Sequence, residues 1–392
     1  MIIGVPREGY PGERRVALVP AVVPGLLKAG LSVLIEAGAG TEAGYPDADY
    51  AGRGARIAGS RVEVFGESDV IVQVLGHGAN DRTGTEDLPL LRRGQKLIAF
   101  LRPLGSPGSV GELAAAGVTS YAIELMPRIT RAQSMDALSS MATIAGYKAV
   151  LIAADTLPRL FPMLMTAAGT ITPARVLIIG VGVAGLQAIA TARRMGAVVS
   201  AYDLRPAVKE QVQSLGARFV EMPLEATDAE DARGYARGQD EAFYRRQREL
   251  LGRAVVESDV VVTSAVVPGR PAPVLITREM VRGMAPGSVI VDRAAERGGN
   301  CEATRGDRSV VEHGVTLIGW YNLASRVPYH ASQMYARNLS AFLLHLWKDG
   351  AVRTSPDDEI VRDTLLTHEG EIVNQRVREF HAPPPRDRES EE

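Results

Sequence analysis

A glycine-rich turn between an apolar strand and a helix constrains the fold of this chain more than any other sequence feature. The pattern Gly-x-Gly-x-x-Gly begins directly after the apolar run 175–179 and opens the helical stretch 186–195. In this spacing the first glycine permits a tight turn, the second lets the backbone approach a pyrophosphate, and the third allows close helix–strand packing. The pattern therefore predicts a Rossmann unit that binds a dinucleotide through Gly180, Val181, Gly182, Val183 and Gly185.

An acidic residue follows the next expected strand at the interval typical of such units. The strand 198–201 leads through Tyr202 to Asp203, whose carboxylate would accept a hydrogen bond from the 2′-hydroxyl of an adenosine ribose and repel a 2′-phosphate. By chance alone the glycine spacing is expected about 0.4 times in such a chain, so the strand, helix and acid are needed to support it. We therefore predict NAD(H) rather than NADP(H), with Leu204 and Arg205 beside the cofactor, although the charge of Arg205 works against that exclusion.

Short apolar, β-branched runs recur along the chain and alternate with helical stretches. Such alternation is typical of a doubly wound parallel sheet. The pattern occurs in two series, so the predicted fold class is α/β, with two doubly wound Rossmann-like domains. The expected strands lie at 2–5, 32–35, 69–74, 96–101 and 118–123 in the first series, and at 175–179, 198–201, 259–263 and 288–291 in the second.

Two long helices are expected to carry the chain between these domains. Apolar residues recur at helical spacing over 133–160 and again over 332–347. The end of the chain, rich in proline and charge, cannot bury a core. The predicted organisation is an N-terminal Rossmann-like domain formed by 1–132 and 331–380, an NAD(H)-binding domain at 133–330, and a disordered tail at 381–392.

Composition excludes several classes of function. The formal net charge is -2, whereas nucleic-acid recognition usually requires a basic excess. A single cysteine, Cys301, excludes a multi-cysteine zinc site and favours a reducing compartment. The most apolar stretch, 176–190, is too short to span a bilayer, and the N-terminus lacks the pattern of a signal peptide. These features predict a cytoplasmic protein with no metal site and no direct membrane span.

A cluster of polar residues occupies the entry to the first long helix. Gln133 and Asp136 would share a face of a helix, where an amide and a carboxylate together can fix a carboxamide such as that of nicotinamide. Arg128 could pair with Asp136 or reach a phosphate. The alternative is ordinary helix capping by Thr130 or Ser134, and the pattern alone favours neither interpretation.

A charged region follows the expected dinucleotide motif. Gly234, Tyr235 and Gly238 lie within the highly charged stretch 228–257, whose second part is predicted to be helical. Glycines around a tyrosine suggest a mobile loop that covers a ligand, whereas a solvated, charged surface is the simpler interpretation.

Several segments together resemble the NAD(H)-binding component of proton-translocating NAD(P) transhydrogenase, over nearly the whole chain from Met1 to about Asn374. The matching segments are 131–140, 180–189, 267–275, 286–292, 298–301 and 325–328. The resemblance implies Re/Si-specific hydride transfer from NADH here to NADP+ on a partner subunit, coupled to proton translocation. It implies catalytic roles for Arg128, Gln133, Asp136 and Ser139, and cofactor contacts by Ile129, Thr130, Leu138, Gly234, Tyr235, Gln247 and Val266.

The same resemblance implies partners and a location. Family members dimerise and engage an NADP(H)-binding subunit and a membrane subunit, so NADP(H) would be bound only by the partner. Some members continue into transmembrane helices, and none follow here. We therefore expect a homodimer that lies in the cytoplasm and associates peripherally with the inner face of the cell membrane through its partners.

Two other functions share part of this sequence pattern. Alanine dehydrogenase shares the motifs around Gly4 and Arg15, but this chain has Leu75 and Arg102 where that enzyme needs a lysine and a histidine, and Glu296 in place of an aspartate. Without a proton-transfer group, reduction of a 2-oxo acid lacks its acid–base step. Arg15 is then expected to pair with a nearby carboxylate. A non-catalytic NAD(H)-binding regulatory subunit differs from the transhydrogenase only in the set Arg128, Gln133 and Asp136.

Overall fold

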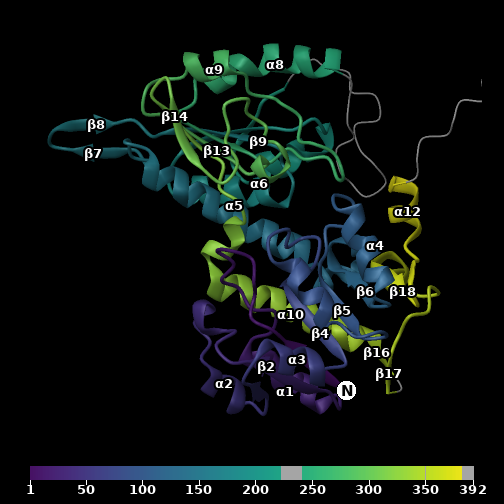
Figure 1. Ribbon diagram of the computed structural model, residues 1–392. Helices are drawn as coiled ribbons and strands as arrows, with labels where there is room; N and C mark the ends of the chain where they lie inside the picture. Colours follow the sequence, from purple (N-terminus) through teal and green to yellow (C-terminus); the bar gives the residue numbers. More distant parts are fainter. Residues whose placement is uncertain (222–240, 349, 382–392) are drawn as a thin grey trace, which may run out of the picture. The chain divides into compact units, whose positions relative to one another are not determined.

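The computed structural model describes residues 1–221, 241–348 and 350–381, and the chain divides into two compact units. The first unit comprises Met1–Leu138 and the chain from Pro328 onward, and the second comprises Ser139–Val327. The boundaries therefore fall at 138/139 and 327/328, where the sequence suggested 132/133 and 330/331. Both units are α/β structures with a largely parallel sheet, so the predicted fold class is confirmed (Figure 1).

The first unit is built on an eight-stranded sheet of order β19-β18-β6-β5-β4-β1-β2-β3. Its six strands from β6 to β3 are parallel, whereas β18 and β19 add to it antiparallel. The strands are β1 (Ile2–Val5), β2 (Ser32–Glu36), β3 (Arg56–Ala58), β4 (Val70–Leu75), β5 (Lys96–Phe100), β6 (Thr119–Ala122), β18 (Leu365–His368) and β19 (Glu371–Ile372). The helices are α1 (Val23–Lys28), α2 (Asp47–Ala51), α3 (Arg61–Glu67), α4 (Pro107–Ala115), α10 (Pro328–Leu346), α11 (Glu359–Thr364) and α12 (Gln375–His381), with a small hairpin of β16 (Trp347–Lys348) and β17 (Ala351–Val352).

The second unit contains a seven-stranded sheet of order β11-β10-β9-β12-β13-β15-β14, in which only β14 is antiparallel. The order reverses at β9, which lies between β10 and β12. The strands are β9 (Arg175–Ile179), β10 (Val198–Tyr202), β11 (Arg218–Phe219), β12 (Val260–Thr263), β13 (Val289–Asp292), β14 (Ser309–Glu312) and β15 (Val315–Ile318). The described helices are α5 (Ala137–Thr156), α6 (Val183–Arg194), α7 (Lys209–Ser214), α8 (Glu241–Val256) and α9 (Arg278–Gly283), and a separate hairpin is formed by β7 (Leu164–Thr166) and β8 (Gly169–Ile171).

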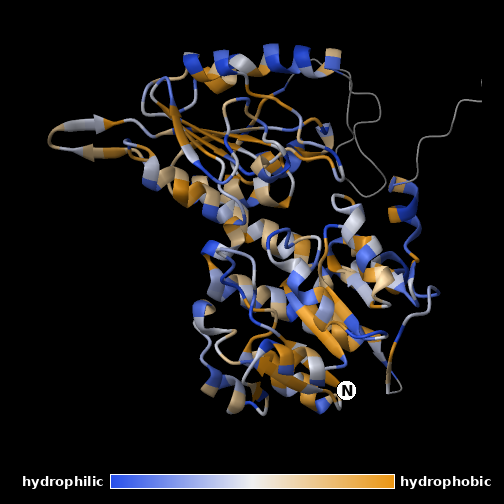
Figure 2. Cartoon of the chain, viewed as in Figure 1, coloured by the Kyte–Doolittle hydropathy of each residue, from blue (hydrophilic) through white to orange (hydrophobic). Residues whose placement is uncertain are grey.

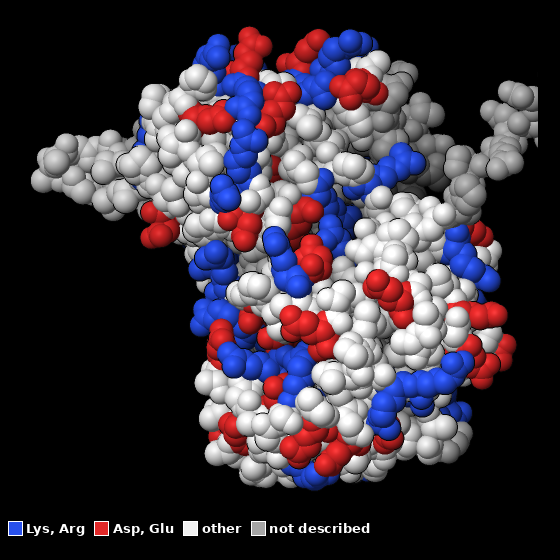
Figure 3. All heavy atoms as spheres, in the orientation of Figure 1, with Lys and Arg blue, Asp and Glu red and all other residues white. Residues whose placement is uncertain are grey.

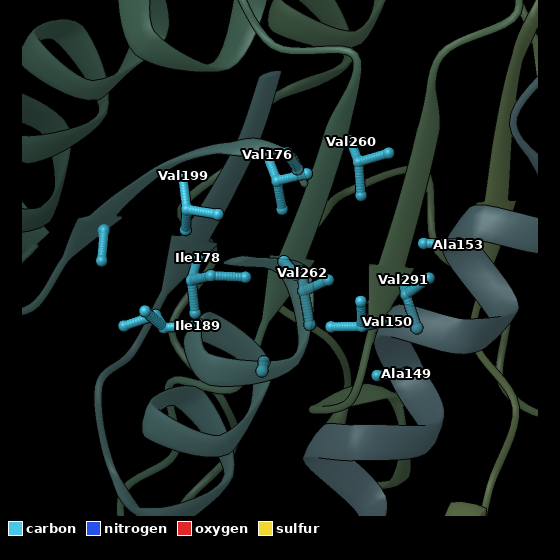
Figure 4. Close-up of a cluster of buried hydrophobic side chains, with 14 of the residues drawn as sticks. Ala149, Val150, Ala153, Val176, Ile178, Ile189, Val199, Val260, Val262 and Val291 are labelled. Carbon is cyan, nitrogen blue, oxygen red and sulfur yellow. The ribbon is translucent and has the colours of Figure 1, made fainter. Parts of the chain in front are cut away.

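The central strands of this sheet are apolar on both faces because helices cover both. Val176 and Ile178 of β9 face one buried cluster with residues of α5 and α6, which Figure 4 shows in close-up. Leu177 and Ile179 of the same strand face a second cluster with residues of α8 and α9. In Figure 2 these strands are correspondingly hydrophobic along their length. Continuous β-branched runs, rather than alternating ones, are what a doubly covered parallel sheet requires.

The two long helices differ from their prediction in where they begin. Helix α5 begins at Ala137 and not at residue 133, and α10 begins at Pro328, at the boundary of the two units. Nearly all of α5 belongs to the second unit and all of α10 to the first. The chain thus passes between the units at the N-terminal ends of these helices.

By length and composition, α5 is also apolar enough to cross a membrane, a property that was not predicted from the sequence. Its residues Ala149, Val150 and Ala153 are fully buried in the core of the second unit. Gly146 lies against α6, where an added methyl group would be 2.1 Å from the carbonyl oxygen of Ala184. These contacts are those of a core helix that packs on the helix following the glycine turn.

Acidic and basic side chains are interspersed on the face of the molecule drawn in Figure 3. No large patch of one sign lies on that face among the described residues, in keeping with a formal net charge of -2.

Candidate functional site

The glycine turn joins β9 to α6 at the point where the strand order reverses. Gly180 has a φ of +91°, and its amide donates to the carbonyl oxygen of Tyr202 at 2.9 Å. A methyl group on Gly185 would lie 2.0 Å from the carbonyl oxygen of Gly180, so only glycine lets α6 start this close to the strand. Gly182 is different, since it is exposed, has an ordinary φ of -77° and faces open space.

This arrangement is suited to an anionic group. The free backbone N–H groups at the start of an α-helix and the positive end of its dipole attract phosphate. Because nothing lies within 4 Å of a methyl group placed on Gly182, the fold itself does not require glycine there. A ligand that approaches the backbone would require it, and the structure therefore fits the pyrophosphate predicted for this turn.

The carboxylate of Asp203 lies beside the turn and is already occupied by four donors. The amide of Val181 donates to it at 2.6 Å. The backbone amide and the Nε and Nη2 atoms of Arg205 donate at 2.9, 2.9 and 3.1 Å. Two carboxylate oxygens offer about four acceptor positions, so a ribose hydroxyl would have to displace one of these donors. Because the Arg205 guanidinium is paired with Asp203, its positive charge is largely neutralised and attracts a 2′-phosphate less.

A buried polar network supports the loop on the other side of the turn. The Ser264 hydroxyl donates to the Gly180 carbonyl oxygen at 2.9 Å. Asn300 is fully buried and brackets Ala265, accepting from its amide at 3.1 Å and donating to its carbonyl oxygen at 2.8 Å. Asp292 in turn accepts from the Asn300 amide at 2.8 Å. The network holds the segment 264–266, including Val266, at the carboxyl edge of the sheet.

Neither Asp292 nor Asn300 was predicted as a site residue from the sequence. The available signal was an aspartate at the end of an apolar strand, followed by Gly298, Gly299 and Asn300. A methyl group on Gly299 would lie 2.8 Å from the Asp292 carboxylate, so this glycine gives the network its room.

Gln247 lies on α8 and contacts the strand that leads to Asp203. It is buried and donates to the Tyr202 hydroxyl at 2.6 Å, while its Oε1 atom has no hydrogen-bond partner in the described part of the chain. Gly234 and Tyr235, predicted to form a mobile loop before this helix, lie outside the described residues.

In the polar cluster at 128–139, residues 128–136 form a turn that precedes helix α5, and residues 137–139 lie in the first turn of that helix. Residues Thr130–Met135 make a 3₁₀ helix, and Asp136 (ψ 82°) separates it from α5. The expectation that Gln133 and Asp136 share one face of an α-helix is therefore wrong. Their proximity comes instead from the turn, in which the Asp136 amide donates to the Gln133 carbonyl oxygen at 3.3 Å.

Within this turn, buried and exposed residues alternate irregularly. Ala132 and Met135 are buried in the first unit, whereas Arg128 and Gln133 are exposed and Asp136 is partly buried. Ile129, Thr130, Leu138 and Ser139 complete the predicted set, with Thr130 and Leu138 exposed and the other two partly buried. The N-cap position of the 3₁₀ helix is Ile129, and no side chain makes a capping hydrogen bond there. Neither Thr130 nor Ser134 caps a helix in a described contact. The capping interpretation therefore lacks its hydrogen bond.

The predicted site residues are divided between the two units. Those from Arg128 to Leu138 belong to the first unit, whereas the glycine turn, Asp203, Gln247, Val266 and Ser139 belong to the second.

The residues at positions that matter for alanine dehydrogenase chemistry either pair with another residue of this chain or lack a proton-transfer group. Arg15 is buried and forms a two-pronged ion pair with Glu13, at 2.7 and 2.5 Å, as expected from the sequence. Leu75 ends β4, and Arg102 has a left-handed backbone with φ of 52°. His77 is buried in the turn after β4 and contacts the carboxylate of Glu112.

The carboxyl group of Glu8, which lies near Glu13 and Arg15, should make the free energy of unfolding depend on pH. Burial, and then the nearby Glu13, raise the pKa of Glu8 to about 8. The folded state therefore keeps a proton that the unfolded chain releases near pH 4.5. Because the folded state binds more protons in this window, the free energy of unfolding should fall as pH rises through it, by at most about 1.4 kcal/mol per pH unit.

Urea unfolding at several pH values across the window measures this slope. Glu8→Gln should flatten it, whereas Glu42→Gln, at an exposed surface ion pair, should leave it unchanged. A Glu8→Gln variant with the same slope as the parent protein would show that Glu8 is ionised in the folded state.

A parallel sheet whose strand order reverses beside a glycine turn, with an acid after the second strand, defines an α/β protein of the dinucleotide-binding Rossmann class. Residues 4–145 match the N-terminal domain, and residues 149–375 the C-terminal domain, of the family described as alanine dehydrogenase/PNT. The chain belongs to this family.

Within the family the chain is more similar to transhydrogenase alpha subunits than to alanine dehydrogenases. It is 47% identical over 377 residues to the first part of NAD(P) transhydrogenase subunit alpha of Rhodospirillum rubrum, with 95% of this chain and 98% of the relative covered. Identity to NAD(P) transhydrogenase subunit alpha of Cereibacter sphaeroides is 43%, covering 95% of this chain and 71% of that longer one. Alanine dehydrogenase of Mycobacterium tuberculosis is 30% identical, with 96% of each chain covered.

Two solved structures have nearly the same fold as this chain, and again the transhydrogenase is more similar in sequence than the alanine dehydrogenase. The crystal structure of transhydrogenase from Sinorhizobium meliloti has a TM-score of 0.81 at 41% identity, covering 96% of this chain and 100% of that one. An L-alanine dehydrogenase has a TM-score of 0.80 at 26% identity, covering 97% and 99%. The resemblance predicted from the sequence is thereby confirmed, and the fold alone does not separate the two activities.

Proposed function

We propose that this chain is the NAD(H)-binding subunit of a proton-translocating transhydrogenase of the Re/Si-specific type. Bound NADH would give its hydride to NADP+ held by a partner subunit, and the proton movement would take place in a membrane subunit. The observation that carries the proposal is the glycine turn with its Asp203 carboxylate, in a chain 47% identical to a transhydrogenase alpha subunit.

The second unit is suited to the adenosine and pyrophosphate part of NAD(H). Gly182 leaves the backbone open to the pyrophosphate at the start of α6. Asp203 would accept the ribose hydroxyls in place of some Arg205 contacts, and its charge would repel a 2′-phosphate. Gln247 and Val266 border the same edge of the sheet, and the predicted contacts of Leu204, Gly234 and Tyr235 are part of the proposal.

The segment 128–139 would act on the nicotinamide. A carboxamide carries an N–H donor pair and a carbonyl acceptor, which a carboxylate and a glutamine amide can match. Asp136 and Gln133 would fix its orientation, with Arg128 and Ser139 beside them. Hydride transfer between two nicotinamides needs no acid or base from the protein, only accurate placement of the rings.

Alanine dehydrogenase activity is the alternative that the relatives raise. The arrangement disfavours it because Arg15 is already paired with Glu13, and Leu75 and Arg102 replace the lysine and histidine of that enzyme. Binding and activity assays separate the two. Titration of the purified chain should show tight NADH binding and much weaker NADPH binding, and pyruvate with ammonia should not oxidise NADH. Steady oxidation of NADH under those conditions would favour alanine dehydrogenase, and binding of NADH with neither reaction would favour a regulatory subunit.

The proposal includes the assembly expected from the resemblance. This subunit would form a homodimer, bind the NADP(H)-binding and membrane subunits, and lie at the cytoplasmic face of the membrane through those contacts. The hairpin β7–β8 supports dimerisation, because it projects from the second unit (Figure 1) and exposes large apolar side chains. The exposed large apolar side chains on and beside this hairpin are Leu160, Met163, Leu164, Met165 and Ile171, exposed by 43–73%.

Charges introduced on this hairpin should convert the dimer into a monomer. Met165 is 73% exposed, and a carboxylate there would remain solvated in a monomer but be desolvated at an interface. Size-exclusion chromatography with light scattering on Met165→Asp, combined with Ile171→Lys, measures the effect. Val311→Asp is the matched control, since Val311 is 67% exposed on β14, which pairs with β15 and not with the hairpin strands. An unchanged dimer in the double variant would place the interface elsewhere.

A further inference from the structure

The turn that carries Gln133 and Asp136 rests on helix α10, and one buried side chain of that helix bonds to it. The Nδ2 atom of Asn338 donates to the carbonyl oxygen of Ser134 at 2.8 Å. Asn338 is 8% exposed, so this bond is shielded from water. Ser134 directly follows Gln133 and precedes Asp136 by two residues, so the bond fixes the backbone between the two polar side chains.

The amide of Asn338 is only half satisfied. Its Oδ1 atom is buried and has no hydrogen-bond partner among the described residues. The amide orientation follows from its neighbour, because a carbonyl oxygen at Ser134 accepts a hydrogen bond only from the NH2 group. Burying an unpaired acceptor costs free energy that an apolar side chain at the same place would avoid. The one side-chain hydrogen bond that this buried amide makes among the described residues is the bond that fixes the turn.

Other contacts hold the turn on either side of Ser134. Ala132 and Met135 are buried in the first unit. At the start of the turn the Arg131 guanidinium donates to Asp358, the N-cap residue of α11, at 3.0 Å. The Asn338 bond then sets the peptide between the exposed Gln133 and the partly buried Asp136.

We propose that Asn338 is a positioning residue for hydride transfer: through Ser134 it holds the backbone so that Gln133 and Asp136 present their polar groups in a fixed orientation. The proposal rests on the proposed function of this turn. Asn338 itself contacts no substrate. Its loss should affect the orientation of the nicotinamide, which limits the transfer rate, more than the affinity for NADH, most of which would come from the second unit.

The test compares three variants in the full chain, mixed with an NADP(H)-binding transhydrogenase subunit. Asn338→Ala should lower the single-turnover rate of hydride transfer by about tenfold or more, as expected for a small displacement of a reacting group. Its NADH dissociation constant and melting temperature should stay close to those of the parent. Ser340→Ala is the matched control, because Ser340 is also a buried polar residue of α10 and makes no described contact with Ser134.

Asn338→Asp adds a readout that a purely structural role would not give. An ionised aspartate cannot donate to the Ser134 carbonyl oxygen, whereas a protonated one can. The transfer rate of Asn338→Asp, relative to the parent protein, should therefore recover as pH is lowered. Even if Asn338→Ala were poorly folded, this recovery in a folded Asn338→Asp protein would support the proposal.

The outcomes separate this inference from the proposed function. If the parent chain transfers hydride and Asp136→Asn slows it, but Asn338→Ala transfers at the parent rate, the positioning role of Asn338 is overturned. Parallel losses of transfer, NADH affinity and stability without recovery of Asn338→Asp at low pH would likewise overturn it. If the parent chain transfers no hydride at all, the proposed function itself fails.

Discussion

Gly182→Ala should leave the protein folded and remove most of its affinity for NADH, whereas Gly185→Ala should damage the fold of the second unit. The contrast follows from what surrounds each glycine. A methyl group on Gly182 meets nothing within 4 Å and the backbone there has an ordinary φ, so the folded protein accommodates alanine. A methyl group on Gly185 would lie 2.0 Å from the Gly180 carbonyl oxygen, which forces α6 away from β9.

The expected magnitudes are large for both. The proposed pyrophosphate contacts would be charge-assisted hydrogen bonds worth about 1.5–3 kcal/mol each, so losing one of them should weaken NADH binding by about tenfold to about 150-fold. Fluorescence titration with NADH and thermal unfolding of both variants measure these effects. Normal NADH affinity in Gly182→Ala would show that the cofactor does not approach this turn, whatever the stability of Gly185→Ala.

Asp136→Asn should slow hydride transfer far more than it weakens NADH binding. The substitution preserves size and removes the negative charge that would accept a hydrogen bond from the carboxamide. Loss of one charge-assisted hydrogen bond predicts a rate lower by about tenfold to a hundredfold. NADH affinity should change by less than about threefold if the second unit supplies most of the binding.

Single-turnover transfer to NADP+ on the partner subunit, together with NADH titration, gives both quantities. Asp155→Asn is the control, because Asp155 is an exposed carboxylate near the end of α5. Equal losses of rate and affinity in Asp136→Asn would contradict a positioning role, and so would an Asp155→Asn variant that slows transfer to the same extent.

The parallel sheets could be predicted because their signal is local. Runs such as 175–179 and 259–263 are apolar on both faces, and β9 and β12 appear within a residue of those bounds. The antiparallel strands β14, β18 and β19 were not predicted. β18 lies between β19 and β6 with three of its four residues buried, whereas β14 and β19 are short strands at the edges of their sheets in which no residue is buried. Local pattern is weak in such strands because one face or one edge contacts solvent.

The site was predicted in its parts but not in its contacts. The Gly180–Asp203 motif is a matter of sequence spacing, and the structure places Asp203 on the Val181 amide. The saturation of that carboxylate by Arg205 depends on a side-chain conformation that spacing does not contain. The helix start was predicted at residue 133 because apolar residues recur at helical spacing from there, whereas residues 130–135 form a 3₁₀ helix and α5 begins at Ala137. Asn300 and Asn338 bond to Ala265 and Ser134, which lie 35 and 204 residues away, and sequence spacing does not identify such partners.

The most direct test of the central claim is isotopic. The purified chain is loaded with NADH that carries deuterium at the transferable position of its nicotinamide and mixed with an NADP(H)-binding transhydrogenase subunit loaded with NADP+. We predict that deuterium appears in NADPH in one turnover, without exchange with solvent, and that the rate falls in Asp136→Asn. Absence of label in NADPH, together with deuterium transfer to pyruvate in the presence of ammonia, would contradict the proposed function and identify the chain as an alanine dehydrogenase.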